Sequence, residues 1–183
     1  MRKTRGFTLI ELIIVVAIIG ILASLLVPNL LVALDKAKQK AAMRDIFILA
    51  TGCGEYLTDH GTWIAVQQNG ELVAQNDFIR AVAPYLKTTP VTDSWGKPFN
   101  VYVGKDAVDN SIPGIPASDV GEEDFLILSH GKDNKPGPTY KTFNPQDPEA
   151  GIYAVLKKAD FDEDLVNWNG SWIIGPRVSK RIT

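Results

Sequence analysis

Cysteine, histidine and, over one long stretch, charge are scarce in this chain of 183 residues. The single cysteine, Cys53, excludes a disulfide within the chain and a zinc site made of several cysteines. The two histidines, His60 and His130, leave little material for a Ser-His-Asp catalytic site. The formal net charge is -2, so the chain lacks the basic surplus of proteins that attract nucleic acids. A hydrophobic fraction of 45% excludes a wholly disordered chain and a multi-span membrane protein.

Residues 12–34 contain no charged side chain. As a helix they would extend about 35 Å, enough to cross a hydrocarbon core of roughly 30 Å. In lipid the helix is favoured because every backbone group must be bonded within the segment. A cleavable signal peptide is the alternative, but its apolar region is usually about 7–15 residues long. We therefore predict a hydrophobic transmembrane and assembly helix over residues 7–34.

Glu11 interrupts the start of this apolar segment. A carboxylate well inside a membrane costs about 2.5–3.5 kcal/mol on insertion scales, so we expect it to have a partner. Cleavage between Gly6 and Phe7 would create an α-amine one helical turn before Glu11. That amine, from the same chain or from a neighbouring copy, is the expected partner, and a neighbour's amine would set the register between subunits.

A contiguous segment begins with Arg5-Gly6-Phe7-Thr8-Leu9-Ile10-Glu11 and continues with apolar residues to Ala23. This segment resembles the class III signal of type IV pilins and type II secretion pseudopilins. The resemblance implies cleavage after Gly6 by a prepilin peptidase, N-methylation of Phe7, and assembly into a helical filament with the hydrophobic helices at its centre. Pro28 matches the helix-kinking proline of the family. Gly20 and Ser24 form a pair of small residues that permits close contacts between helices.

The soluble part of the chain begins with a continuation of the helix. Apolar residues recur there at three- and four-residue spacing, which predicts an amphipathic helix to about Leu57 with residues 59–61 as its end. We expect Gly52 and Gly54 to permit close packing against the rest of the head. The predicted domains are a leader at 1–6, the hydrophobic helix at 7–34, and the helix stem with a periplasmic globular head at 35–183.

Shorter patterns in the head predict one more helix and several strands. The helix is expected at 77–86 with Asn76 or Asp77 as its cap, and the strands at 99–103, 124–129, 152–156 and 172–174. The third of these strands has a short helix as its alternative. Residues 106–121 and 132–149 are expected to be loops. The fold class is α+β: a long N-terminal helix packed on a small antiparallel β-sheet head, as the pilin resemblance implies.

Three motifs in the head match, in order, motifs of the major (G-type) pseudopilins. They are Asp93-Ser94-Trp95-Gly96-Lys97-Pro98-Phe99, Ser129-His130-Gly131-Lys132-Asp133-Asn134 and Asp162-Glu163-Asp164-Leu165-Val166-Asn167-Trp168. Two features depart from that family's pattern. Asn134 stands where the family usually has glycine, and the stretch 138–161 is longer than the family's short loop.

The resemblance to the major pseudopilins implies that this region binds calcium. The candidate ligands are the side chains of Asp133, Asp162 and Asp164, with main-chain carbonyls near Ser129 or His130. Oxygen-rich turns suit calcium, which takes about six to eight oxygen ligands. The alternative is that these acidic side chains only solvate a loop.

These observations together predict a structural subunit of a type II secretion pseudopilus rather than an enzyme. Its expected partners are copies of itself, minor pseudopilins, prepilin peptidase and an inner-membrane secretion platform, without nucleic acid. Its expected location is the inner membrane, with one span and a periplasmic head, and then a periplasmic or cell-surface filament. One alternative is a type IV pilus subunit for adhesion, motility or DNA uptake, although pilins usually carry a disulfide that Cys53 alone cannot form. The other is a membrane-tethered periplasmic binding module or hydrolase.

Overall fold

The computed structural model describes residues 6–105, 120–137, 146–147 and 149–177. Residues 1–5 of the expected leader, most of the loop expected at 106–121, and part of the insertion at 138–161 lie outside this range. The chain divides into two compact units, Met1–Ala37 and Lys38–Thr183. The division falls within the first helix, α1 (Leu9–His60), just after the uncharged segment of the sequence.

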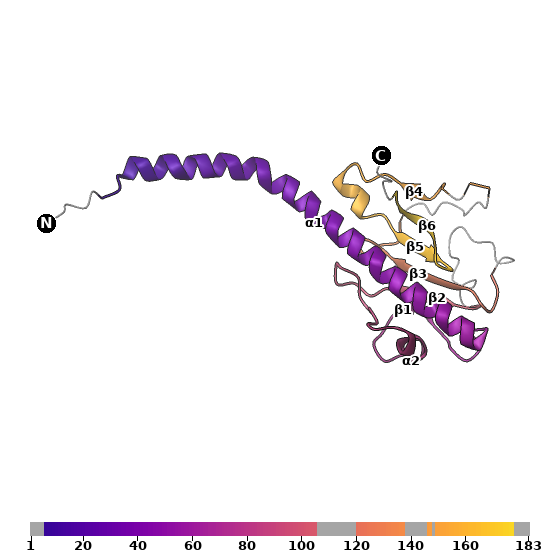
Figure 1. Cartoon of the computed structure of the whole chain (residues 1–183). Helices are drawn as coiled ribbons and strands as arrows, with labels where there is room; N and C mark the ends of the chain where they lie inside the picture. Colours follow the sequence, from indigo (N-terminus) through magenta and orange to yellow (C-terminus); the bar gives the residue numbers. More distant parts are fainter. Residues whose placement is uncertain (1–5, 106–119, 138–145, 148, 178–183) are drawn as a thin grey trace, which may run out of the picture. The chain divides into compact units, whose positions relative to one another are not determined.

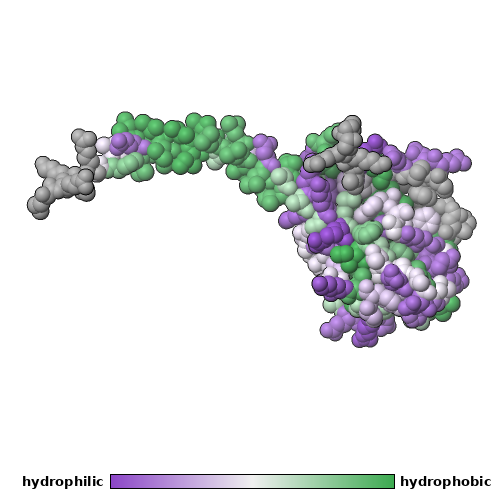
Figure 2. All heavy atoms as spheres, viewed as in Figure 1, coloured by the Kyte–Doolittle hydropathy of each residue, from purple (hydrophilic) through white to green (hydrophobic). Residues whose placement is uncertain are grey.

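The first unit contains the N-terminal part of α1, which is apolar on all sides. Its large apolar side chains between Leu9 and Leu34 are 40–75% exposed, and Figure 2 draws this part almost entirely in the hydrophobic colour. A window of 18 residues in α1 has a mean hydropathy of 3.0 and no buried residue, so the helix is long and apolar enough to cross a membrane. A helix that is apolar all round is stable only in lipid or among other apolar helices.

Polar side chains in this part of α1 are bonded to the backbone of the helix itself. The Ser24 hydroxyl donates to the Ile21 carbonyl at 2.7 Å, and the Asn29 amide donates to the Leu25 carbonyl at 3.2 Å. Pro28 lies inside the helix, which continues past it. The segment therefore presents few unsatisfied polar atoms to an apolar environment.

In the second unit α1 continues to His60, three residues beyond the end expected near Leu57. Gly61 follows with a φ of +79°, and its amide donates to the Leu57 carbonyl at 2.8 Å. A glycine in the left-handed region is a common way for a helix to end. The expected stop at residues 59–61 is confirmed.

The head is built on one sheet of six strands (Figure 1). In chain order the strands are β1 (Asn69–Glu71), β2 (Asn100–Val103), β3 (Phe125–Ser129), β4 (Ile152–Tyr153), β5 (Leu165–Trp168) and β6 (Ser171–Pro176). Their order in the sheet is β1-β2-β3-β5-β6-β4, and every pair is antiparallel except β4 with β6. The expected long helix on a small sheet is confirmed, with the correction that the edge pair β4 and β6 makes the sheet mixed.

Short helical elements complete the head. They are α2 (Asp77–Val82) and the 3-10 helices η1 (Ala83–Tyr85) and η3 (Lys158–Phe161). Asn76 caps α2, because its side chain accepts from the Ile79 amide at 2.8 Å. Pro84 falls within η1, where the helical path tightens after α2. The expected cap at Asn76 is confirmed, and the expected helix to residue 86 consists of these two shorter pieces.

The sequence patterns missed β5, although a signal for it was present. β5 and β6 form a hairpin around Asn169 and Gly170, whose φ angles are +49° and +84°. An Asn-Gly pair between two apolar segments is a strong sequence signal for a two-residue hairpin. The family resemblance treats residues 162–168 as one motif, which does not mark the strand within them.

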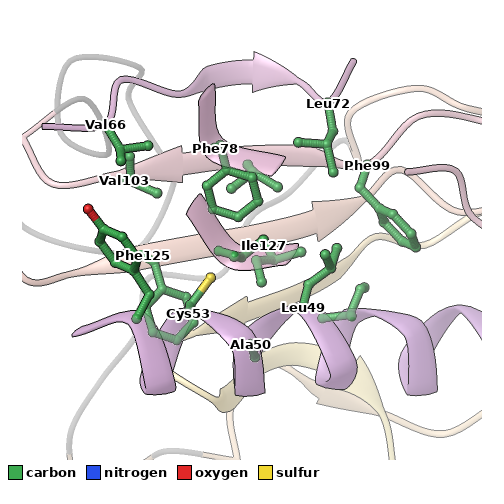
Figure 3. Packing of buried hydrophobic residues seen from close by; sticks show 14 of the residues in the cluster. Leu49, Ala50, Cys53, Val66, Leu72, Phe78, Phe99, Val103, Phe125 and Ile127 are labelled. Atoms are coloured by element: carbon green, nitrogen blue, oxygen red, sulfur yellow. The ribbon is translucent and has the colours of Figure 1, made fainter. Parts of the chain in front are cut away.

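The main core lies between the stem of α1 and one face of the sheet. Figure 3 shows Leu49, Ala50 and Cys53 of α1 beside residues of the head that include Phe78, Phe99 and Ile127. A second cluster lies on the opposite face and consists of Leu126, Leu128, Val166, Ile173 and Ile174. The four apolar residues of β3 alternate between the two clusters, and Ser129 at its end is buried as well.

One of the two glycines expected to pack closely does so. A Cβ added to Gly52 would lie 2.8 Å from Leu86, whereas one added to Gly54 would meet nothing within 4 Å. Close packing of the stem against the segment after η1 therefore explains Gly52 and not Gly54.

Adjacent residues of the stem give a direct test of this packing. Ile46 is 0% exposed in the core, while Phe47 beside it is 58% exposed. We expect Ile46→Ala to lower the free energy of unfolding by about 2–4 kcal/mol, because it leaves a cavity in the core. Phe47→Ala is the matched control and should change it by less than about 0.5–1 kcal/mol. Urea unfolding of the two full-length variants in detergent micelles measures the difference, and equal losses would contradict this packing.

Candidate functional site

Glu11 has a partner within its own helix start. Its carboxylate accepts from the Thr8 amide at 2.9 Å and from the Thr8 hydroxyl at 2.6 Å, and the Glu11 amide donates to the Thr8 hydroxyl oxygen at 3.4 Å. This is the reciprocal arrangement of a capping box, in which a threonine and a glutamate three residues later satisfy each other's free backbone groups. The sequence reasoning missed this role, although Thr8 and Glu11 at this spacing are its usual signal.

The three head motifs, far apart in the sequence, meet in the folded head. Ser129 at the end of β3 donates from its hydroxyl to Asp93 at 2.7 Å, and His130 contacts Asp164 with its Nδ1 3.3 Å from a carboxylate oxygen. The pairing of β3 with β5 places Ser129 opposite Leu165, so His130 and Asp164 stand next to each other beyond the last pair.

Asp93 joins the first motif to the second. One of its carboxylate oxygens accepts from the backbone amides of Trp95 and Lys97, each at 2.9 Å, and the other accepts from the Ser129 hydroxyl. The Ser129 hydroxyl oxygen accepts in turn from the Gly131 amide at 3.3 Å. Asp93 is 5% and Ser129 0% exposed, so a buried carboxylate with three donors holds these two turns together.

Asp164 joins the third motif to the turn after β3. Its side chain is 2% exposed, and besides His130 it accepts from the Gly137 amide at 2.9 Å. Ser129 and His130 therefore turn toward different carboxylates. This is the arrangement expected for neighbours on a strand, and it does not form a Ser-His pair.

Glycine is required where the turn crosses the third motif. Gly131 has a φ of +64°, and a Cβ added to it would lie 2.7 Å from the Glu163 carbonyl oxygen and 2.8 Å from that of Phe161. Asn134 has a φ of +55°, a conformation that asparagine tolerates better than most residues. The departure from glycine at Asn134 is thus compatible with the backbone of the turn.

The described residues bring together only part of the expected calcium ligand set. The segments 129–133 and 161–164 lie side by side, since the Lys132 amide donates to the Phe161 carbonyl at 2.9 Å. Asp133, however, accepts from the Lys135 amide at 3.0 Å within its own turn. Within the described ranges, no three His, Cys, Asp or Glu side chains are grouped so that they could hold a metal ion.

Three carboxylates lie close enough to Tyr153 to affect its ionisation. Its hydroxyl accepts from the Gln39 amide at 3.1 Å, which ties β4 to the stem. Burial, and then the negative charges of Glu163, Asp164 and Asp160, raise the pKa of Tyr153 far above its usual value. A cluster of negative charge at a partly buried position favours the approach of a cation.

Comparison with known proteins locates the chain in a family. Residues 1–27 match the family model described as the prokaryotic N-terminal methylation motif. The type II secretion system core protein G of Dickeya chrysanthemi is 41% identical over 169 residues, covering 92% of this chain and 88% of that protein. That of Escherichia coli K12 is 33% identical over 131 residues, covering 68% of this chain and 90% of that protein.

The chain belongs to the type II secretion system core protein G family. A third relative of the same name, from Aeromonas hydrophila, is 36% identical over 107 residues, covering 55% of this chain and 73% of that protein. No solved structure gives a match. The expected resemblance to the major pseudopilins is thereby confirmed.

The close approach of Gly131 to the backbone of residues 161–163 can be tested by substitution. Gly131→Ala adds a Cβ against two carbonyl oxygens in the left-handed region, while Gly170→Ala meets nothing within 4 Å at a similar positive φ. We expect Gly170→Ala to cost about 1–2 kcal/mol of folding free energy, from backbone strain alone. Gly131→Ala should cost about 1–3 kcal/mol more, from the steric clash. Thermal unfolding of both full-length variants measures the difference, and equal costs would mean that the turn does not pack in this way.

Proposed function

We propose that this chain is a structural subunit of a type II secretion pseudopilus. In this proposal prepilin peptidase cleaves after Gly6, the new N-terminus at Phe7 is methylated, and the subunits assemble from the inner membrane into a helical filament that drives protein secretion. The observation that carries the proposal is the likeness to a type II secretion system core protein G over 92% of the chain. The methylation-motif match at residues 1–27 supports the processing step.

The exposed apolar surface of α1 supports the proposal that the subunits assemble into a filament. Its apolar surface up to Leu34 is exposed on every side in the single chain, and such a surface requires lipid before assembly and other helices after it. Transfer of identical subunits from lipid to a head-to-tail helical array would satisfy both requirements. The relatives named above support the secretion system over a type IV pilus. The expected partners are minor pseudopilins and the inner-membrane secretion machinery.

A structural role is also favoured over an enzymatic one. Ser129 and His130 are bound to different carboxylates, and each carboxylate also accepts from the backbone, so both are used to hold turns in place. The proposal places the head in the periplasm, with the apolar part of α1 as a single membrane anchor.

Replacing Glu11 separates its charge from its capping role. Glu11→Gln keeps an oxygen that can accept from Thr8 but removes the negative charge, whereas Thr8→Val removes the hydroxyl and keeps the charge. If Glu11 pairs with an N-terminal amine of a neighbour, we expect Glu11→Gln to insert normally and to reduce assembly more than tenfold, because a paired charge in an apolar environment is worth at least about 2 kcal/mol. Thr8→Val should assemble nearly as well as the unaltered chain.

Both variants are expressed in cells. The amount of cross-linked multimer measures assembly, and the amount of chain that stays in the membrane fraction after alkaline extraction measures insertion. Normal assembly of the Glu11→Gln chain would refute the charge pairing. An equal defect in both variants would assign the effect to the helix cap instead.

We propose in addition that the turn after β3 binds calcium with Asp162 and Asp164 among its ligands. The adjacency of the second and third motifs and the negative charge around Tyr153 support this. Calcium chloride at about 100 times the dissociation constant should stabilise the head by about 2.7 kcal/mol, a rise of roughly 5–10 °C in Tm.

The calcium proposal is tested by thermal unfolding with calcium chloride and with chelator. Asp162→Asn should abolish the difference between the two conditions. Asp77→Asn, which removes an exposed carboxylate of α2 beside Arg80, should leave it unchanged. A full-length chain whose Tm is the same in both conditions would rule calcium out.

A further inference from the structure

Three lysines, Lys36, Lys38 and Lys40, follow the apolar segment of α1 within six residues of Leu34. All three are exposed, and none forms an ion pair with any residue that the structure describes. The next basic residue, Arg44, differs from them because it is bound to Asp45 at 3.2 Å. The three lysines are therefore exposed positive charges that directly follow the apolar segment of α1 and have no ion-pair partner among the described residues.

Cleavage of the leader would make these lysines the first basic residues of the chain. Residues 1–5 carry three basic side chains, and residues 7–35 carry none. Basic residues close to a span normally mark the cytoplasmic side and set its orientation. Lysines on the opposite side oppose that signal, so orientation of the helix does not account for them.

The positions of the lysines match the layer of lipid headgroups. A helix rises 1.5 Å per residue, so Lys36 to Lys40 lie about 3–9 Å beyond the end of the apolar segment along α1. The headgroup layer on each side of a bilayer is about 5–7 Å thick, and lysine side chains reach several ångströms further. All three ammonium groups are thus within reach of lipid phosphates.

The three lysines point in different directions around the helix axis, which favours contact with lipid headgroups over contact with one protein surface. At 3.6 residues per turn, Lys36 and Lys40 lie on nearly the same side of α1 and Lys38 on the opposite side. A flat protein surface could meet only one side of the helix at a time. Gln39, between these lysines, is buried against the head, but all three lysines are exposed, and lipid headgroups can approach the helix from every direction that the head leaves open.

We propose that Lys36, Lys38 and Lys40 bind the phosphates of anionic phospholipids and hold the unassembled subunit at the membrane surface. This rests on the proposed membrane anchoring of the chain. Each lysine near a charged bilayer favours anionic lipid by up to about fivefold. The attraction falls off over about one Debye length, which salt shortens. Extraction of the subunit into a filament would then break these contacts along with the lipid contacts of the apolar helix.

The test uses the full chain in bilayers of phosphatidylcholine with spin-labelled phosphatidylglycerol or spin-labelled phosphatidylcholine. The electron spin resonance spectrum gives the fraction of each labelled lipid that is held at the protein. We expect phosphatidylglycerol to be favoured about three- to fivefold, and the preference to fall toward one in high salt and in a Lys36→Gln, Lys38→Gln, Lys40→Gln triple variant.

A matched control removes three exposed lysines of the head instead, by Lys87→Gln, Lys97→Gln and Lys158→Gln. It has the same net charge as the first triple variant and should keep the lipid preference. Equal loss in both variants would assign the preference to overall charge and overturn the proposal. Loss of assembly in the first variant with its lipid preference intact would also overturn it, and would indicate a neighbouring subunit as the partner.

Flotation of the chain with the vesicles under alkaline conditions is measured in the same samples. A chain that does not float with the vesicles would overturn both the membrane anchoring and the lipid contact. A chain that is inserted but shows no preference for phosphatidylglycerol would overturn the lipid contact alone.

Discussion

The head depends on the burial of one face of α1 against the central strand β3. Phe125 and Ile127 of that strand join the core beneath the stem, while Leu126 and Leu128 join the cluster on the other face of the sheet. One short strand thus connects both apolar clusters, and its end at Ser129 carries the turn to which the other two motifs are bound. The packing of the stem and the geometry of the candidate site are therefore parts of one arrangement.

The same helix meets two different environments along its length. Up to Leu34 it is apolar all round and exposes its side chains, whereas beyond Lys38 one side of it is buried under the head. Gln39, 2% exposed and bonded to Tyr153, is an early polar contact of the stem with the sheet. Between these two regimes lie the exposed lysines, where the sequence changes from uncharged to charged. One continuous helix thus contains both a segment that is long and apolar enough to cross a membrane and the stem that packs in the head.

Periodicity and local chemistry predicted the elements whose signals are contained in a few neighbouring residues. They located the uncharged helix, its stop at Gly61, the cap at Asn76 and the strands β2 and β3. They missed the cap formed by Thr8 and Glu11 and the hairpin at Asn169, although the spacing of Thr8 and Glu11 and the Asn-Gly pair are local signals of these structures. The parallel pairing of β4 with β6 and the link from Asp93 to Ser129 depend on contacts between distant residues, which spacing in the sequence does not encode. The family resemblance implied only that the second and third motifs share a site, whereas the link of the first motif to them and the positions of the carboxylates required the folded chain.

The burial of Cys53 has a practical consequence. Its side chain is 0% exposed, and burial holds the pKa of the thiol well above its usual range, so little of the reactive thiolate is present. We therefore expect Cys53 to react very slowly with thiol reagents while the chain remains folded. Cysteines introduced at exposed positions would therefore be the reactive thiols of the chain. They could map contacts between neighbouring copies by disulfide formation without first replacing Cys53.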